Sequence, residues 1–146
     1  MGDKGQKIEV HVSGAMLRHA VCFAYFVRAM LGALVLANFL AIVSDPTLPK
    51  LYASGVRFMR EPKGTETFVD LYEVIRKGGG DCAHLAAWRV AELRALGERA
   101  TLRVTWQVDE IRRIRVFHVV VRRADGSVED PSALLGMRSV AESVSA

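Results

Sequence analysis

The chain has 146 residues, of which 51% are apolar and 25% charged, with a formal net charge of +4 at pH 7. This length is typical of a single domain, residues 1–146, and the apolar content excludes a globally disordered protein. Two cysteines are too few for a disulfide scaffold. The positive charge is modest and is not gathered with stacking aromatic residues, so no specific nucleic-acid interface is expected.

Residues 14–43 form a long apolar segment, which two prolines at positions 46 and 49 end. Four polar side chains interrupt it: Arg18, His19, Arg28 and Asn38. The longest uncharged run, 29–44, is shorter than the ~20 residues of a membrane span. We therefore predict a long helix, buried against the domain or in a homo-oligomer interface, in a cytoplasmic protein. Membrane insertion and a signal segment are the alternatives for this stretch. Within it, Cys22 is expected to be a small buried apolar residue.

Two further helices are predicted on either side of a glycine run at 78–80. The first begins with Thr65 as a candidate cap and carries Phe68, Leu71, Tyr72 and Ile75 at helical spacing. The second begins near Asp81 and ends at Gly97. The second helix is expected to bury one face, which carries Leu85, Trp88, Leu93 and Leu96.

Alternating β-prone residues follow the helices and predict strands over 100–108 and 111–123, then a third strand that ends at Pro131. The order of helices followed by consecutive antiparallel strands indicates an α+β domain with N-terminal helices. Several arginines flank the second strand and are expected to form a solvated strand edge: Arg112, Arg113, Arg115, Arg122 and Arg123.

Cys82 stands at the start of the second of these helices, directly behind the glycines. Free backbone N–H groups and the helix dipole at such a position favour the thiolate over the thiol. The glycines are expected to turn the chain sharply and to leave the sulfur accessible. This placement suits a nucleophile, although a cysteine also packs at a helix end without any chemical role.

A nucleophilic cysteine needs a base, and the chain has four histidines. His11 lies in the polar N-terminal segment and His19 in the apolar helix. Neither has an orienting residue at a spacing that would place it beside the ring. His84 is about 200° around the helix from Cys82 and points away from the sulfur. His118 lies in the middle of a strand among β-branched residues. A polar ring is unfavourable there unless it has a hydrogen-bond partner or a chemical role, so His118 is the candidate base.

The hairpin after His118 supplies a candidate for the third group. The three-residue loop 124–126 suits a type I turn that a glycine in the left-handed conformation closes. That loop length pairs Val120 with Asp130 and puts His118 and Asp130 on one face as diagonal neighbours. A two-residue loop would put Asp130 on the opposite face, so the expected contact tests the register.

The stretches "GGGDCAHLAAWRVAELRALGERATLRV", "FHVVV" and "DGSVEDPS" together resemble the transglutaminase-like superfamily of cysteine enzymes. The resemblance covers residues 64–135, and "LYASGVRFMREP" is similar to segments of small phage-associated members. It implies a papain-like core in which the nucleophile begins a helix packed on an antiparallel sheet. It also implies Cys82 as nucleophile, His118 as general base and Asp130 as the orienting acid, with no cofactor.

The resemblance implies acyl transfer on an amide or peptide bond through a thioester, with a peptide or protein as substrate. Hydrolysis by a peptidase or amidase is expected, and transglutaminase crosslinking is the first alternative. A catalytically weak or inactive assembly module of a phage or bacterium is the second. Such enzymes commonly place a Trp, Gln or Asn donor before the cysteine, which the segment between Arg60 and Asp81 lacks. Tyr72, Thr65 or a residue of the N-terminal half would have to replace it.

No metal site is expected, because the potential ligands lack the paired spacing of zinc sites. Those considered are Asp81, Cys82, His84, His118 and Asp130. On the cysteine helix, Arg89 is expected to form a structural ion pair and Trp88 to lie in the core. Trp106 and Gln107 are candidates for lining a cleft.

Overall fold

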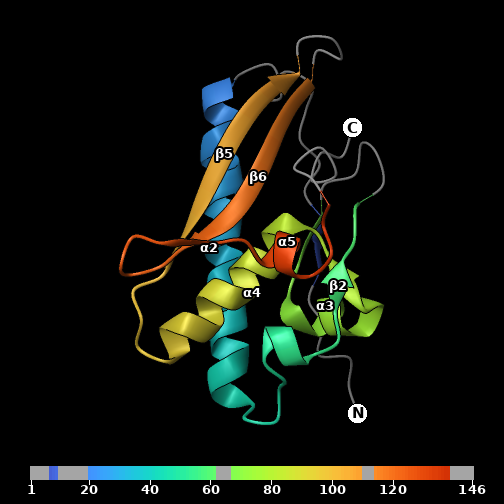
Figure 1. Ribbon diagram of the computed structural model, residues 1–146, viewed down its shortest axis with the longest axis vertical. Helices are drawn as coiled ribbons and strands as arrows, with labels where there is room; N and C mark the ends of the chain where they lie inside the picture. Colours follow the sequence, from blue (N-terminus) through green and yellow to red (C-terminus); the bar gives the residue numbers. More distant parts are fainter. Residues whose placement is uncertain (1–6, 10–19, 62–66, 110–113, 139–146) are drawn as a thin grey trace.

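The computed structural model describes residues 7–9, 20–61, 67–109 and 114–138 (Figure 1). It confirms an α+β chain with an N-terminal helix and a small antiparallel sheet. The elements are β1 (Lys7–Glu9), α2 (Ala20–Ser44), the 3₁₀ helix η1 (Leu51–Ala53), β2 (Arg57–Phe58), β3 (Thr67–Val69), α3 (Leu71–Lys77), β4 (Gly79–Gly80), α4 (Cys82–Ala95), β5 (Thr101–Asp109), β6 (Ile114–Arg122), β7 (Val128–Glu129) and α5 (Pro131–Leu134).

Helix α2 runs behind the rest of the domain, with α4 crossing in front of it and β5 and β6 beside its N-terminal half (Figure 1). One side of α2 is buried through Val27, Leu31, Leu34 and Val35, which recur at helical spacing. The other side is exposed and includes Cys22, so the expectation that Cys22 is buried is wrong. Because α2 packs through one face only, an apolar residue on its outer face stays in solvent.

The span Ala24–Ser44 of α2 has the length and composition to cross a membrane, and 28% of it is buried within the domain. Core helices of soluble proteins and signal sequences satisfy the same criteria. The start predicted for this helix at residue 14 lies outside the described residues.

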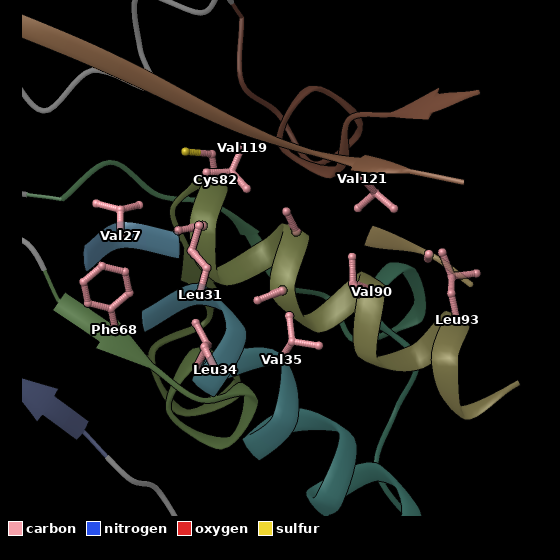
Figure 2. Packing of buried hydrophobic residues seen from close by; sticks show 14 residues of the cluster. Val27, Leu31, Leu34, Val35, Phe68, Cys82, Val90, Leu93, Val119 and Val121 are labelled. Atoms are coloured by element: carbon pink, nitrogen blue, oxygen red, sulfur yellow. The ribbon is translucent and has the colours of Figure 1, made fainter. Parts of the chain in front are cut away.

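Helix α4 lies between β6 and α2 at the centre of the domain (Figure 2). Asp81 caps its N-terminus, and Gly97 follows its end with φ of +90°, as predicted. The expected single buried face is wrong. Leu93 packs toward α2 and the sheet, Leu85 and Trp88 pack in a second cluster, and Leu96 is 71% exposed. A helix covered on two sides buries nearly its whole circumference.

The helix predicted from Thr65 begins later, at Leu71, where the Asp70 carboxylate accepts a hydrogen bond from the Glu73 N–H. Phe68 belongs instead to β3, which pairs antiparallel with β1 so that Ile8 faces Phe68. Long-range strand pairing outweighs the helical spacing of the apolar residues here. Thr65 itself lies outside the described residues.

The glycine run is packed rather than loose. Gly78 ends α3 with φ of +80°, and Gly79–Gly80 form β4, which pairs in parallel with β2. A Cβ atom at Gly79 would lie 2.4 Å from the carbonyl oxygen of Arg57. The run therefore permits close contact between the backbones of β2 and β4 and leads the chain into the start of α4.

The three-stranded sheet has the order β5–β6–β7, and its register matches the prediction. Val121 pairs with Glu129, and the Arg123 N–H donates to the Ser127 carbonyl over 2.8 Å. The loop has three residues, and Gly126 closes it with φ of +86°. This register places Asp130 on the same face of the hairpin as His118.

Candidate active site

His118 and Asp130 form a hydrogen bond, with 2.8 Å between His118 Nε2 and Asp130 Oδ2. His118 lies in β6 and is 6% exposed, and Asp130 directly follows β7 as the N-terminal cap of α5. The predicted diagonal pair is therefore present. The loop length decides this contact, since it sets which residues of β7 share a face with His118.

The two carboxylate oxygens of Asp130 have separate partners. Oδ2 accepts from His118, while Oδ1 accepts from the Ala133 N–H over 3.3 Å. Burial works against the charged carboxylate. The hydrogen bond from His118 and the N–H groups at the start of α5 outweigh burial, so the pKa of Asp130 lies below its ordinary value. Asp130 is consequently ionised at neutral pH.

The second ring nitrogen of His118, Nδ1, is buried and has no hydrogen-bond partner among the described residues. An ionised Asp130 favours the tautomer with the hydrogen on Nε2, which leaves a lone pair on Nδ1. A buried nitrogen that lacks a partner is uncommon in folded proteins. Nδ1 is thus available to accept a proton.

Cys82 is the first residue of α4 and lies under β6, with its sulfur beside Val119 (Figure 2). The backbone N–H groups of Val119 and Ala83 favour the charged form of this sulfur. Val119 is the neighbour of His118 in the same strand. The structure therefore brings the cysteine to the strand that carries the His118–Asp130 pair.

The expectation of an exposed, acidified sulfur is wrong, because Cys82 is 2% exposed. Burial raises the pKa of the Cys82 thiol above its usual value, and the charges of Asp81 and, more weakly, Asp130 raise it further. The N–H groups of Val119 and Ala83 oppose this effect but are outweighed. The thiol is accordingly protonated at neutral pH.

Alkylation of the two cysteines tests this difference. We expect iodoacetamide at pH 7.5 to modify the exposed Cys22 at least about tenfold faster than Cys82, since each unit of pKa lowers the thiolate fraction tenfold. The Cys82 rate should rise steadily from pH 7 to pH 10. Peptide mapping by mass spectrometry measures both rates in one sample. Faster labelling of Cys82 than of Cys22 at pH 6 would contradict the raised pKa.

His84 has a structural role that its sequence position did not reveal. It forms a capping box with Asp81, and its Nε2 lies 2.7 Å from the Thr67 carbonyl oxygen. Ligand atoms of Glu61, Asp81 and His84 lie within 4.8 Å of one another. Both ring nitrogens of His84 are nevertheless engaged in hydrogen bonds, so this cluster stabilises the start of α4.

Glu129 is the centre of a charged network that sequence reasoning missed. Its carboxylate accepts from Arg89 Nε over 2.6 Å, Tyr52 Oη over 2.7 Å and an Arg123 N–H over 3.0 Å. Burial opposes the charge, but the hydrogen bonds and the two arginines outweigh it and lower the pKa of Glu129. The expected ion pair of Arg89 is confirmed. Since Glu129 precedes Asp130, the network anchors the strand end that presents the carboxylate to His118.

Other candidates for the site have different partners. The Tyr72 hydroxyl lies 3.4 Å from Asp45 Oδ2, and Asn38 Oδ1 accepts from the Leu71 N–H over 2.9 Å. Trp106 packs against Phe117 with 5.5 Å between the ring centroids. Trp88 is fully buried in the core, as expected. The side chain of Gln107, like Thr65, His11 and His19, lies outside the part of the chain that is described.

A carboxylate, an imidazole with a free lone pair and a thiol thus come from the end of β7, the middle of β6 and the start of α4. Among the described residues no hydrogen bond joins the Cys82 sulfur to His118 Nδ1. Proton transfer from sulfur to nitrogen therefore requires the two groups to move closer together. No family model, curated protein or solved structure matches this chain.

Proposed function

We propose that the protein is a cysteine-dependent acyl-transfer enzyme that acts on an amide or peptide bond, most simply as a peptidase or amidase. The observation that carries the proposal is the 2.8 Å hydrogen bond from His118 Nε2 to Asp130, together with a buried Nδ1 that has no partner in the part of the chain that the structure describes. Cys82 packs under the same strand. A solely structural histidine would normally have both ring nitrogens satisfied.

In this proposal Cys82 Sγ attacks the carbonyl carbon of the scissile bond while His118 Nδ1 takes the thiol proton. A C–S bond forms, and the imidazolium is stabilised by the ionised Asp130. His118 then returns the proton to the amine nitrogen as the C–N bond breaks, leaving a thioester on Cys82. Water hydrolyses the thioester, and the acid product leaves.

The raised pKa of Cys82 determines which form of this mechanism fits. A thiol with a raised pKa does not persist as a thiolate paired with an imidazolium, so the proton moves as the sulfur attacks. Because the side chain is 2% exposed, substrate contact also requires local movement around the start of α4. The backbone N–H of Cys82, at the positive end of the helix, supplies one donor to the developing oxyanion.

The burial of Cys82 favours one rival, a structural module that keeps the fold without catalysis. In that case the sulfur is simply part of the apolar cluster that includes Val119 and Leu31. The two functions differ in one measurable property: the enzyme forms an acyl adduct on Cys82 and the structural module does not.

Acylation by p-nitrophenyl acetate separates these functions. The enzyme should release a burst of p-nitrophenolate and carry one acetyl group on Cys82, located by peptide mapping after acid quenching. A Cys22→Ser variant should behave as the unmodified chain does. Acetylation confined to Cys22 would reject the enzymatic proposal. Adding a primary amine tests transglutamination, because an amine that competes with water yields the acetamide.

A further inference from the structure

A groove separates α2 from the end of α4 and the start of β5. It consists of two adjoining cavities of about 550 Å³ and 340 Å³, which share Gly32, Val35 and Arg94. One bank is apolar and comes from α2, with Leu36 and Phe39 among its residues. The other bank is basic, and the groove lies away from the His118–Asp130 pair, so the candidate active site does not explain it.

Outside the groove, α2 continues as an exposed apolar surface. Four large side chains on it are more than half exposed: Tyr25 (68%), Leu36 (57%), Leu40 (53%) and Val43 (52%). Their spacing places them on one side of the helix, and Gly32 and Leu36 join this side to the groove. No acidic residue occurs between positions 10 and 44. The surface therefore combines apolar area with an absence of negative charge.

Four exposed arginines line the groove: Arg28 on α2, and Arg94, Arg99 and Arg103 on the basic bank opposite it. None of them forms an ion pair with a carboxylate of the described residues. Glu98 is the acidic side chain in the lining, and Arg123 already holds it with contacts of 2.6 Å and 2.7 Å. The positive charge of the groove is thus not neutralised within the part of the chain that the structure describes. Uncompensated positive charge of this kind attracts an anionic partner.

We propose that the groove and the outer face of α2 form a peripheral binding surface for an anionic lipid bilayer. Leu36, Leu40 and Val43 enter the boundary between headgroups and acyl chains, while the arginines contact lipid phosphates. A second copy of this chain explains the surface less well. Pairing through α2 would bring two sets of uncompensated arginines together without acidic partners. The helix remains packed on α4, so it lies on the membrane and does not span it.

Vesicle sedimentation tests the proposal on the unmodified chain. We expect binding to vesicles of phosphatidylcholine with phosphatidylglycerol and little binding to phosphatidylcholine alone. Raising the salt concentration should weaken the interaction with the anionic vesicles, because salt screens the arginines. Equal binding to both vesicles, or binding to neither, would overturn the proposal.

Matched charge variants locate the surface. Neutralising three arginines in Arg28→Gln/Arg99→Gln/Arg103→Gln should lower the partition coefficient by roughly a hundredfold, at roughly fivefold per arginine. The control Arg57→Gln/Arg60→Gln/Lys77→Gln removes the same charge from exposed residues near the opposite end of α4. It should bind nearly as the unmodified chain does. Equal losses in the two variants would show a general charge effect and overturn the assignment.

An apolar pair distinguishes the bilayer from self-association. Leu36→Ser/Leu40→Ser should lower vesicle binding at least about tenfold, and Leu134→Ser, at a 63% exposed position on α5, should not. Circular dichroism melting verifies that each variant folds. Analytical ultracentrifugation without lipid should find a monomer. A dimer that only the Leu36→Ser/Leu40→Ser change dissociates would identify the surface as a contact between copies and overturn the membrane proposal.

Discussion

Replacing Asp130 with asparagine is expected to lower the rate of the proposed acyl transfer by up to about 10⁴-fold, the scale that loss of the orienting acid reaches in catalytic triads. Asp130 has one oxygen for His118 and one for the Ala133 N–H. Asparagine has a single acceptor oxygen, so it cannot satisfy both. If its amide NH₂ faces His118, the ring hydrogen moves to Nδ1, and the lone pair that the proposed mechanism uses to accept the cysteine proton is lost.

The substitution also affects stability. If the oxygen turns to His118, the Ala133 N–H loses its cap, at a cost of about 1 kcal/mol. The lowered pKa of Asp130 means that its charged form stabilises the fold above the ordinary aspartate pKa. That stabilisation is lost as the pH falls through the lowered value. The asparagine variant should lack this part of the acid dependence in urea unfolding curves measured at several pH values.

Asp125→Asn is the matched control for Asp130→Asn. Asp125 lies in the turn of the same hairpin, is exposed, and accepts from the Ser127 N–H over 2.8 Å. Its replacement should leave the burst with p-nitrophenyl acetate unchanged. Cys82→Ala measures the background rate of the assay in the absence of the proposed nucleophile. An Asp130→Asn rate equal to that of Asp125→Asn would remove Asp130 from the mechanism, whatever the structure of the hairpin.

Replacing Gly79 with alanine is expected to lower the free energy of unfolding by about 3 kcal/mol, the upper part of the range for overpacking. The added Cβ would lie 2.4 Å from the Arg57 carbonyl oxygen and 2.5 Å from the Met59 side chain. Met59 is a flexible side chain and can move, but the Arg57 backbone belongs to the β2–β4 pair. Relieving the clash therefore separates that pair and disturbs the segment that leads into Cys82.

Gly32→Ala is the comparison variant, for which the free energy of unfolding should change in the opposite direction. Gly32 lies inside α2, and a Cβ there would meet nothing within 4 Å. Alanine should stabilise the helix by about 0.5–1 kcal/mol, because glycine is the poorer helix former. Urea denaturation of both variants measures the two changes. An unfolding free energy for Gly79→Ala within 0.5 kcal/mol of the unmodified chain, at roughly the scatter of surface substitutions, would refute the tight packing of β4.

The sequence predicted the parts of the candidate site that depend on local geometry. The Asp81 cap and Gly97 bound α4, because capping involves neighbouring residues. The three-residue loop closed by Gly126 settled which residues face His118, because side chains alternate along a strand. Both predictions are confirmed. Neither required knowledge of contacts distant in the sequence.

The sequence did not reveal the environment of Cys82. Its position at a helix start predicted a thiolate, yet the segment lies beneath β6, and the removal of water outweighs the helix dipole. Burial of this kind depends on how α4 packs against both β6 and α2. The same limit explains Phe68, whose helical spacing was overridden by pairing with β1.

Local chemistry in the sequence thus determined an α+β order, the boundaries of α4 and the His118–Asp130 pair. Caps, turn lengths and strand alternation act between residues a few positions apart. They can therefore be predicted from the order of residues along the chain. Only the tertiary structure decided the burial of Cys82, the Glu129 network and the groove beside α2. Each depends on elements that are far apart in the chain, and desolvation and charge pairing follow from which surfaces meet.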